Sequence, residues 1–432
     1  MSEGNRVLLE EGQIEDCEST VVREENPTEI LYFLGLVLYI TRMMDAETQW
    51  EYPTILLPLM DLLVIALLGG HVFLSLRYYE SKQILLLAIA LLVSAVSGYN
   101  SDNFVPWVVT CLLVFGAVGI DFKKILKVYL LVGGTICVIT VIASLMGIIE
   151  NVSDTLETER ESLVAEATER QCLGYGWSTN MANHVFFLIL TYFAWIGRKF
   201  NFKEMLLFFT LSLWVLGRTV SRLSMLCVVM LLVFSLAYRF GFFRRIMNRK
   251  ITVYMLILSV PFFAFISYYM TASFDEASLE WIVVDVFLTG RLSIGKEALE
   301  SAGMSLFGQE YDMYSSARDD GQLYNYLDNS YLQLFVIYGL LYASLLIAAY
   351  VVIVKQAGRR KDVILMVSVF MAGFTGLIAQ HFIEAYMNPF LLALFASHLG
   401  DTAESVTVVT EEDSELVTEI AGNENAETYG IA

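Results

Sequence analysis

Three arginines differ in position from most of the basic residues of this chain. Most of the 27 Lys and Arg residues fall in every second gap between apolar stretches, whereas Arg218, Arg222 and Arg291 lie in the alternate gaps or at their edges. Arg218 and Arg222 are four residues apart, so they would share one face of a continuous helix. A guanidinium is a planar fork of N–H donors that binds phosphate oxygens bidentately, which suits a pyrophosphate. The alternative interpretation is that these arginines anchor helix ends to lipid headgroups.

A second group of residues could transfer protons. His381 follows an apolar stretch, and Glu384 lies three residues later. Histidine and glutamate are common general acids and bases because burial and neighbouring charges tune their pKa values. Asp328 and Asn329 open another apolar stretch, where they could belong to the same site or simply cap a helix. His184 has a weaker claim, and His381 could equally be a polar residue at the level of the headgroups.

Other chemistries lack their sequence signatures. There is no P-loop, no Gly-x-Gly-x-x-Gly motif and no His/Cys spacing of the zinc-binding kind, so neither a metal nor a cofactor is expected. The five Cys residues show no paired spacing that would indicate a disulfide framework. The net charge of -19 argues against nucleic acid as a partner.

The composition is that of a membrane protein. Hydrophobic residues make up 56% of the chain and charged residues only 17%. The apolar stretches predict an all-α polytopic protein with about twelve membrane-spanning helices, because each approaches the length that crosses a bilayer. The predicted spans are 29–44, 54–76, 83–99, 104–120, 125–149, 183–197, 204–217, 222–240, 251–272, 331–354, 363–380 and 386–399.

The basic residues predict the orientation of these spans. Lys and Arg are retained on the cytoplasmic side, so the gaps that hold most of them should face inward. This places both termini inside as acidic tails, over 1–28 and 400–432. The two long gaps, 150–182 and 273–330, then lie outside. The outer loop 273–330 separates the first nine spans, which lie within residues 29–272, from the last three, which lie within residues 331–399. Its apolar residues recur at helical spacing, which predicts short amphipathic helices that form a cap. Asp61 lies within a span, where pairing with another helix would account for it.

Several short motifs occur together in order. They are Ser221-Arg222-Leu223-Ser224, then Gly290-Arg291 with Leu306-Phe307-Gly308-Gln309, then Asp328-Asn329-Ser330-Tyr331-Leu332 with Gly339. Over roughly residues 175–395 the chain thereby resembles the O-antigen ligase and repeat-unit polymerase superfamily, which includes the Wzy-type polymerases of capsule, O antigen and exopolysaccharide. It departs from many relatives at Ile294-Gly295, where they carry a Trp.

The resemblance implies a GT-C-like, metal-independent, inverting glycosyltransferase in the cytoplasmic membrane of a bacterium. The donor would be a polyprenyl-pyrophosphate-linked oligosaccharide, and the acceptor a second lipid-linked repeat. Arg218, Arg222 and Arg291 would bind the pyrophosphate, and His381 or Glu384 would be the base. A flippase and a chain-length regulator of the same pathway are possible partners. The alternatives are a ligase that transfers the glycan to another acceptor, and a polysaccharide transporter or flippase.

Overall fold

The computed structural model describes residues 28–154, 170–313 and 325–398, and these residues are mostly helical. One short antiparallel sheet joins β1 (Ser153–Asp154) to β2 (Arg170–Gln171), with Ser153 opposite Gln171. The α-helices are α1 Glu29–Asp45, α2 Leu56–Ser75, α3 Ser81–Asn100, α4 Phe104–Gly116, α5 Phe122–Leu145, α6 Ser178–Ile196, α7 Phe202–Thr219, α8 Arg222–Tyr238, α9 Gly241–Met247, α10 Lys250–Ile257, α11 Ser259–Ala272, α12 Leu279–Phe287, α13 Arg291–Ser301, α14 Ser330–Gln333, α15 Leu340–Arg359 and α16 Val363–Thr375.

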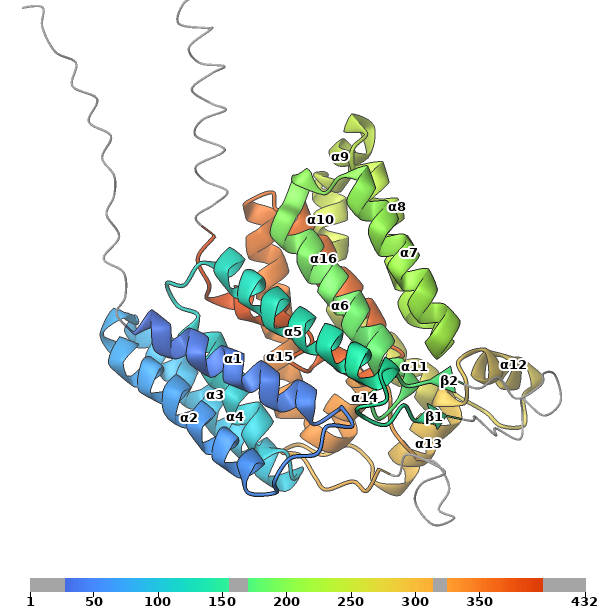
Figure 1. The fold of residues 1–432 in the computed structure, drawn as a ribbon, viewed down its shortest axis with the longest axis horizontal. Coiled ribbons are helices and arrows are strands. Elements are labelled where there is room, and N and C mark those ends of the chain that lie inside the picture. Colours follow the sequence, from blue (N-terminus) through green and yellow to red (C-terminus); the bar gives the residue numbers. More distant parts are fainter. Residues whose placement is uncertain (1–27, 155–169, 314–324, 399–432) are drawn as a thin grey trace, which may run out of the picture.

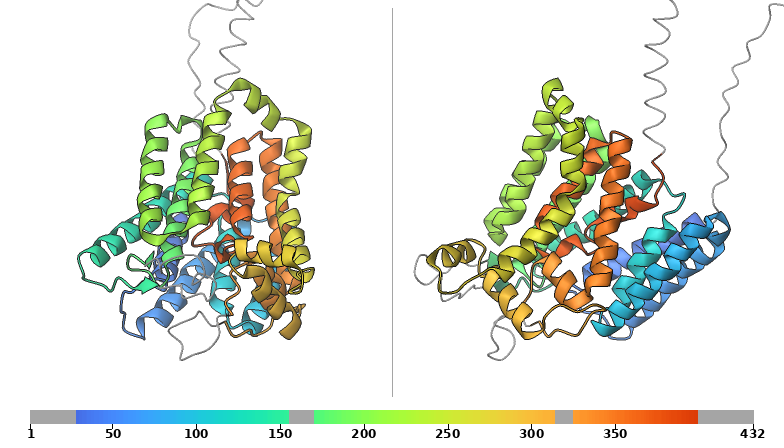
Figure 2. Two further views of the ribbon diagram at one scale, coloured as in Figure 1. Left: turned by 90° about the vertical axis from the view of Figure 1, so that its right-hand side faces the viewer. Right: turned by 180° about the vertical axis from the view of Figure 1, so that it is seen from behind.

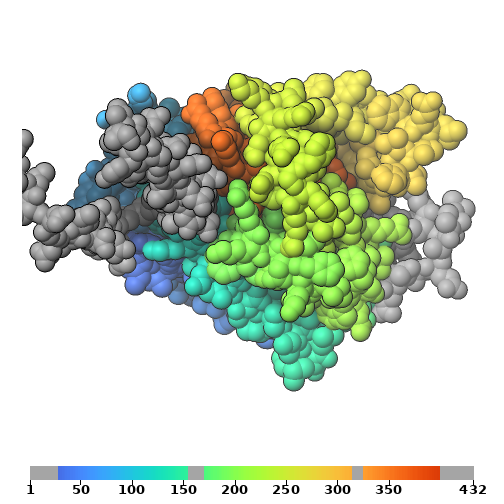
Figure 3. All heavy atoms as spheres, turned by 90° about the horizontal axis from the view of Figure 1, so that it is seen from above, coloured from blue at the N-terminus to red at the C-terminus, as the bar shows by residue number. Residues whose placement is uncertain are grey.

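The long helices form a bundle with two distinct ends (Figure 1). Helices α1 to α4 pack together along one side, and α5 connects them to the rest by packing on both α1 and α6. Helices α12 and α13 lie together at one end, here called the cap end, and α9 lies at the opposite, far end (Figure 2). Seen from the far end, the α9 segment covers the middle of the molecule and the α12–α13 segment projects past its edge (Figure 3).

Several helices are suited to a bilayer. Four of them, α2 with its short extension η1 (Leu76–Tyr78), α3, α5 and α15, are long and apolar enough to cross a membrane, and two bent pairs raise the number to as many as six. One pair, α8 and α9, turns by 110°, so α9 lies across the far end instead of lengthening α8. Exposed leucines, isoleucines and phenylalanines cover the outside of the bundle. Many are on these helices, as a surrounding hydrocarbon phase requires.

The expected span 331–354 is wrong in its bounds. The chain forms α14 and a π-helical turn, η4 (Leu334–Tyr338), and then breaks at Gly339, whose φ is +90°. The continuous helix α15 starts only after this glycine. Gly339 lies against the backbone of residues 306–308, and Leu340 and Leu341 donate hydrogen bonds to the carbonyls of Ser305 and Leu306. Packing against this loop therefore sets the start of the span, which an apolar run alone does not reveal.

The expected helical span 386–399 is also wrong. After α16 the chain forms two 3₁₀ turns, η5 (Gln380–Phe382) and η6 (Pro389–Leu394), and Ser397 then pairs with Asp121 at the start of α5. This segment is buried in protein along most of its length. Asn388 bonds to the carbonyl of Phe382 at 2.6 Å and accepts from the amide of Phe390. Irregular backbone is tolerated at membrane depth where protein satisfies it in this way.

The expected short helices of the loop 273–330 are confirmed as α12 and α13. They are joined by a turn at Gly290, with φ of +80°, and by Asp285 of α12. The buried Asp285 carboxylate accepts hydrogen bonds from the first amides of α13, those of Leu292 and Ser293, at 2.9 and 3.2 Å. It thereby satisfies donors that a helix start leaves open. The expectation for Asp61 is confirmed as well, because it pairs with Arg42 of α1 at 3.1 Å. The acidic tails lie almost wholly outside the described residues.

Replacing Gly339 with alanine is expected to destabilise the protein. An added Cβ would overlap the backbone of residues 306–308, including the carbonyl carbon of Phe307 at 2.8 Å. The alanine would also have to adopt the positive φ of +90° that Gly339 has here. The cost should be about 2 kcal/mol or more. Thermal unfolding in detergent should show a clearly lower Tm for Gly339→Ala. The control is Gly134→Ala within α5, where a Cβ meets no atom within 4 Å. Equal Tm values for both variants would contradict this description of the break.

Candidate active site

The centre of the candidate site is the hydrogen bond between His381 and Glu384. His381 lies in η5 and is only 3% exposed, and its Nδ1 is 2.6 Å from Glu384 Oε2. A carboxylate accepts this bond, so the neutral imidazole carries its proton on Nδ1. The described residues give His381 Nε2 no hydrogen-bond partner. The tautomer thus leaves Nε2 with a lone pair that can take a proton, as general-base catalysis requires.

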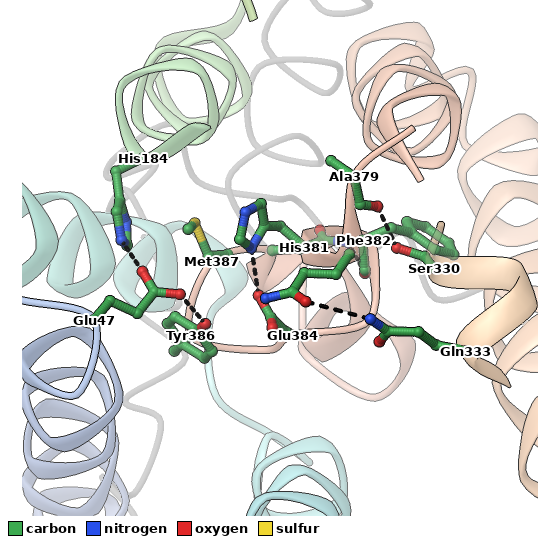
Figure 4. A network of polar contacts seen from close by, with 12 residues as sticks. Glu47, His184, Ser330, Gln333, Ala379, His381, Phe382, Glu384, Tyr386 and Met387 are labelled. Atoms are coloured by element: carbon green, nitrogen blue, oxygen red, sulfur yellow. Dashed lines mark hydrogen bonds and ion pairs between the residues drawn. The ribbon is translucent and has the colours of Figure 1, made fainter. Parts of the chain in front are cut away.

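A second histidine–glutamate pair lies beside the first (Figure 4). Glu47, in the connection between α1 and α2, has its Oε2 2.6 Å from His184 Nε2 of α6. The other carboxylate oxygen of Glu47 accepts a hydrogen bond of 2.6 Å from the hydroxyl of Tyr386. Tyr386 follows Glu384 by two residues, so Glu47 connects α6 to the segment that carries His381.

The two pairs form one polar cluster. Ligand atoms of Glu47, His381 and Glu384 all lie within 4.8 Å of one another, close enough to share a cation. However, one oxygen of Glu384 is already bonded to His381, and both Glu47 oxygens accept hydrogen bonds. The two carboxylates therefore have protein partners of their own, and the cluster is satisfied as a hydrogen-bonded network. The arrangement fits proton transfer better than metal ligation.

The surrounding charges raise the pKa of His381. Burial lowers this pKa, but the carboxylate of Glu384, with further contributions from Glu47 and Asp328, outweighs burial. For Glu47, burial acts in the opposite direction and raises the pKa. The charge and the hydrogen bond of His184 outweigh burial, so the pKa of Glu47 is lowered overall. His381 is thus a stronger base than an ordinary histidine, provided that the pH is high enough to leave it neutral.

The turn that carries His381 is held from several sides. Ser330 of α14 donates a hydrogen bond to the carbonyl of Ala379 at 2.6 Å. Gln380 accepts hydrogen bonds from Gln333, at 3.3 Å, and from the hydroxyl of Tyr326. These contacts come from the segment that leads into α14 and from α14 itself. They fix the residues immediately before His381, which restricts the direction of its ring.

Arg291 is attached to this turn rather than free to bind a ligand. Its Nε donates to the carbonyl of Ile378 at 2.8 Å, and its Nη2 lies 3.0 Å from Asp328 Oδ2. Its Nη1 donates to the carbonyl of Leu288 and to the hydroxyl of Thr289. Most of its donors are thus used within the protein. Arg291 thereby fastens α13 to the segment that precedes His381 and, through Asp328, to the segment that precedes α14.

Arg218 and Arg222 do not share a helix face. Helix α7 ends at Thr219, α8 starts at Arg222, and Val220 between them has a φ of +53°. The chain reverses here, which agrees with the expected gap between the spans 204–217 and 222–240, so the two arginines do not belong to one helix. Both arginines are exposed at the cap end; Arg218 bonds to Gln171 of β2 at 3.1 Å. Arg222 makes no hydrogen bond or ion pair with the described residues.

Asn329 has a structural role that the sequence left open. Its side chain caps α14 by accepting from the amides of Tyr331 and Leu332 at 2.9 and 3.1 Å. It also donates to the carbonyl of Leu377 at 2.7 Å. The alternative of a helix cap is thus confirmed for Asn329, whereas Asp328 pairs with Arg291.

Sequence reasoning missed Glu47 and Tyr386, and gave His184 too little weight. All three lie in or beside gaps assigned to the outer side, as His381 does. That shared side was the available signal, but the pairing joins residues 137 and 339 positions apart along the chain. No family model, curated protein or solved structure matches this chain.

Removing the Arg291 side chain is expected to loosen the attachment of α13. Arg291→Ala breaks contacts to Ile378 and Leu288 and removes the ion pair with the half-buried Asp328, which should cost about 1–3 kcal/mol. The Tm in detergent should fall, and Arg291→Lys should recover little of it because the planar fork is lost. Arg218→Ala is the control, since this exposed side chain makes one hydrogen bond to Gln171. An unchanged Tm for Arg291→Ala would show that the guanidinium does not hold the cap.

Proposed function

We propose that this protein is a polymerase that joins polyprenyl-pyrophosphate-linked oligosaccharide repeat units into a surface polysaccharide. The observation that carries the proposal is the His381–Glu384 pair, in which His381 Nδ1 is bonded to the carboxylate and Nε2 has no hydrogen-bond partner among the described residues. The exposed arginines at the α7–α8 turn and the order of the motifs support the same chemistry.

The proposed reaction is one inverting displacement. An acceptor hydroxyl oxygen attacks the anomeric carbon of the donor, and His381 Nε2 takes the hydroxyl proton as the new bond forms. The bond between the anomeric carbon and the pyrophosphate oxygen breaks, and the electron pair leaves with the polyprenyl pyrophosphate. Glu384 holds the Nδ1 proton and stabilises the imidazolium, as the carboxylate does in a catalytic triad. Glu384 thereby acts through His381.

The departing pyrophosphate requires cations. Arg222 and Arg218 are the best candidates, because both side chains are exposed and Arg222 makes no ion pair within the described residues. Helix α6 links the turn of these arginines to the cluster that holds the base. Ser224 of α8 bonds to Asn183 of α6 at 2.8 Å, and the next residue of α6, His184, bonds to Glu47. Arg291 retains little free donor capacity, so its contribution to pyrophosphate binding would be smaller.

The proposed setting is the cytoplasmic membrane of a bacterium. Arg244, Arg245, Arg249 and Lys250 lie at the far end, and the preference of basic residues for the cytoplasm would place this end inside. The cap end and the base would then face outward, where flipped lipid-linked repeats are found. The twelve-span topology, with both termini inside, belongs to this proposal, as do a flippase and a chain-length regulator as partners.

The test is polymer formation by the purified protein in lipid vesicles that contain only lipid-linked repeat units. The wild type should produce a ladder of glycan lengths, and a chelator should leave the ladder intact. His381→Gln should reduce transfer about 10²–10⁴-fold, the usual share of general acid–base catalysis, while donor binding remains. Arg222→Ala should abolish the ladder without lowering the Tm.

Arg245→Ala is the matched control, because Arg245 is also exposed but lies at the far end; it should leave the ladder unchanged. A folded wild type that makes no ladder would contradict the proposal. If product then forms only when a lipid A core or protein acceptor is added, the protein is a ligase. A ladder that disappears with the chelator and returns with a divalent cation would contradict the metal-free reaction.

A further inference from the structure

The Glu47–His184 pair is a buried polar pair that takes no part in the proposed reaction as described above. Glu47 has a side chain 12% exposed, and that of His184 is 1% exposed. Burying a carboxylate is costly unless it is paired, and leaving its partner unpaired costs more. Stability alone gives little reason to bury such a pair, since an apolar replacement is often as stable. A role in the neighbouring site would account for the burial of this pair.

Glu47 is held in place from both sides. His184 bonds to Oε2 and Tyr386 bonds to Oε1, each at 2.6 Å, so the carboxylate has little freedom to turn. His184 comes from α6, and Tyr386 comes from the turn that carries His381 (Figure 4). A carboxylate oxygen of Glu47 remains within 4.8 Å of a His381 ring nitrogen. Glu47 is therefore a fixed negative charge next to the proposed base.

We propose that Glu47 is a positioning residue for His381: held by His184 and Tyr386, its carboxylate orients the turn that carries the base and stabilises the imidazolium formed when the acceptor is deprotonated. This inference rests on the proposed function. Glu47 does not touch the reacting atoms and takes no proton from the acceptor. It acts on the charge that His381 acquires, as preorganised charges do in other active sites.

The charges around His381 come from several elements. Glu384 lies in the same turn, Glu47 in the α1–α2 connection, and Asp328 before α14, where Arg291 of α13 pairs with it. His184 faces Glu47 from α6. Only Glu47 is a carboxylate that approaches His381 without bonding to it or to an arginine among the described residues. Its charge can therefore be removed while the His381–Glu384 and Arg291–Asp328 contacts remain.

The experiment compares Glu47→Gln with the wild type in the vesicle assay across pH. The amide oxygen of glutamine can accept from Tyr386 and the amide nitrogen can donate to the other tautomer of His184, so both hydrogen bonds can persist without the charge. Because the cation of His381 loses a stabilising neighbour, its pKa should fall. The acid limb of the rate profile should then move to lower pH by about one unit, and the rate on the plateau should drop because the base is weaker.

Glu204→Gln is the matched control. Glu204 also accepts a hydrogen bond from a tyrosine, Tyr192, at 2.9 Å, but it lies at the start of α7, at the far end. Its replacement should leave the acid limb unchanged. Glu47→Asp keeps the charge and should restore the acid limb towards its wild-type position even where the rate stays low. The difference in acid limb between Glu47→Gln and Glu47→Asp is expected even if either variant lowers the Tm.

The outcomes separate the two proposals. A wild type without a ladder would overturn the proposed function itself. A wild type with a ladder, and Glu47→Gln with an acid limb that superimposes on it, would overturn the role of Glu47. Equal displacement of the acid limb in Glu47→Gln and Glu47→Asp would overturn it as well, because the loss of packing and not of charge would then be the cause.

Discussion

The burial of charge at the cap end is the constraint on which the rest of this structure depends. Two histidines and two glutamates lie together in a bundle whose surroundings are apolar, and each charge there must find a partner. The partners come from the α1–α2 connection, α6 and the segment after α16, which are distant in sequence. Because each buried charge needs a partner, the α1–α4 layer, the central helices and the last segment must pack against one another at this cluster.

The irregular last segment follows from the same requirement. A continuous helix after α16 would satisfy its own backbone, but it could not turn His381, Glu384 and Tyr386 towards Glu47 within six residues. The chain instead uses 3₁₀ turns, and Asn388 and the hydroxyl of Tyr129 satisfy the backbone groups of Phe382 and Met387 that these turns leave open. The apolar side chains of the segment remain buried, so the loss of helix is compensated by packing.

The sequence predicts the helices well where hydrophobicity decides them and poorly where tertiary contacts do. The expected spans 54–76 and 125–149 correspond closely to α2 and α5, because long apolar runs need only length and composition. The break at Gly339 depends on contact with residues 305–308, and the 3₁₀ turn at Pro389 depends on burial. His381 and Glu384 were predicted because they are three residues apart. Glu47 was not predicted and His184 was given little weight, because their pairing is defined only in three dimensions.

The most direct test of this account is the protonation state of the His381 ring in the folded protein. With only four histidines in the chain, uniform ¹⁵N-histidine labelling and comparison with His381→Gln would assign its two ring nitrogens by NMR. Above the pKa of His381, the account predicts a proton on Nδ1 and none on Nε2. A neutral ring with its proton on Nε2, or a ring that keeps both protons at the pH of fastest polymer formation, would contradict its role as the base.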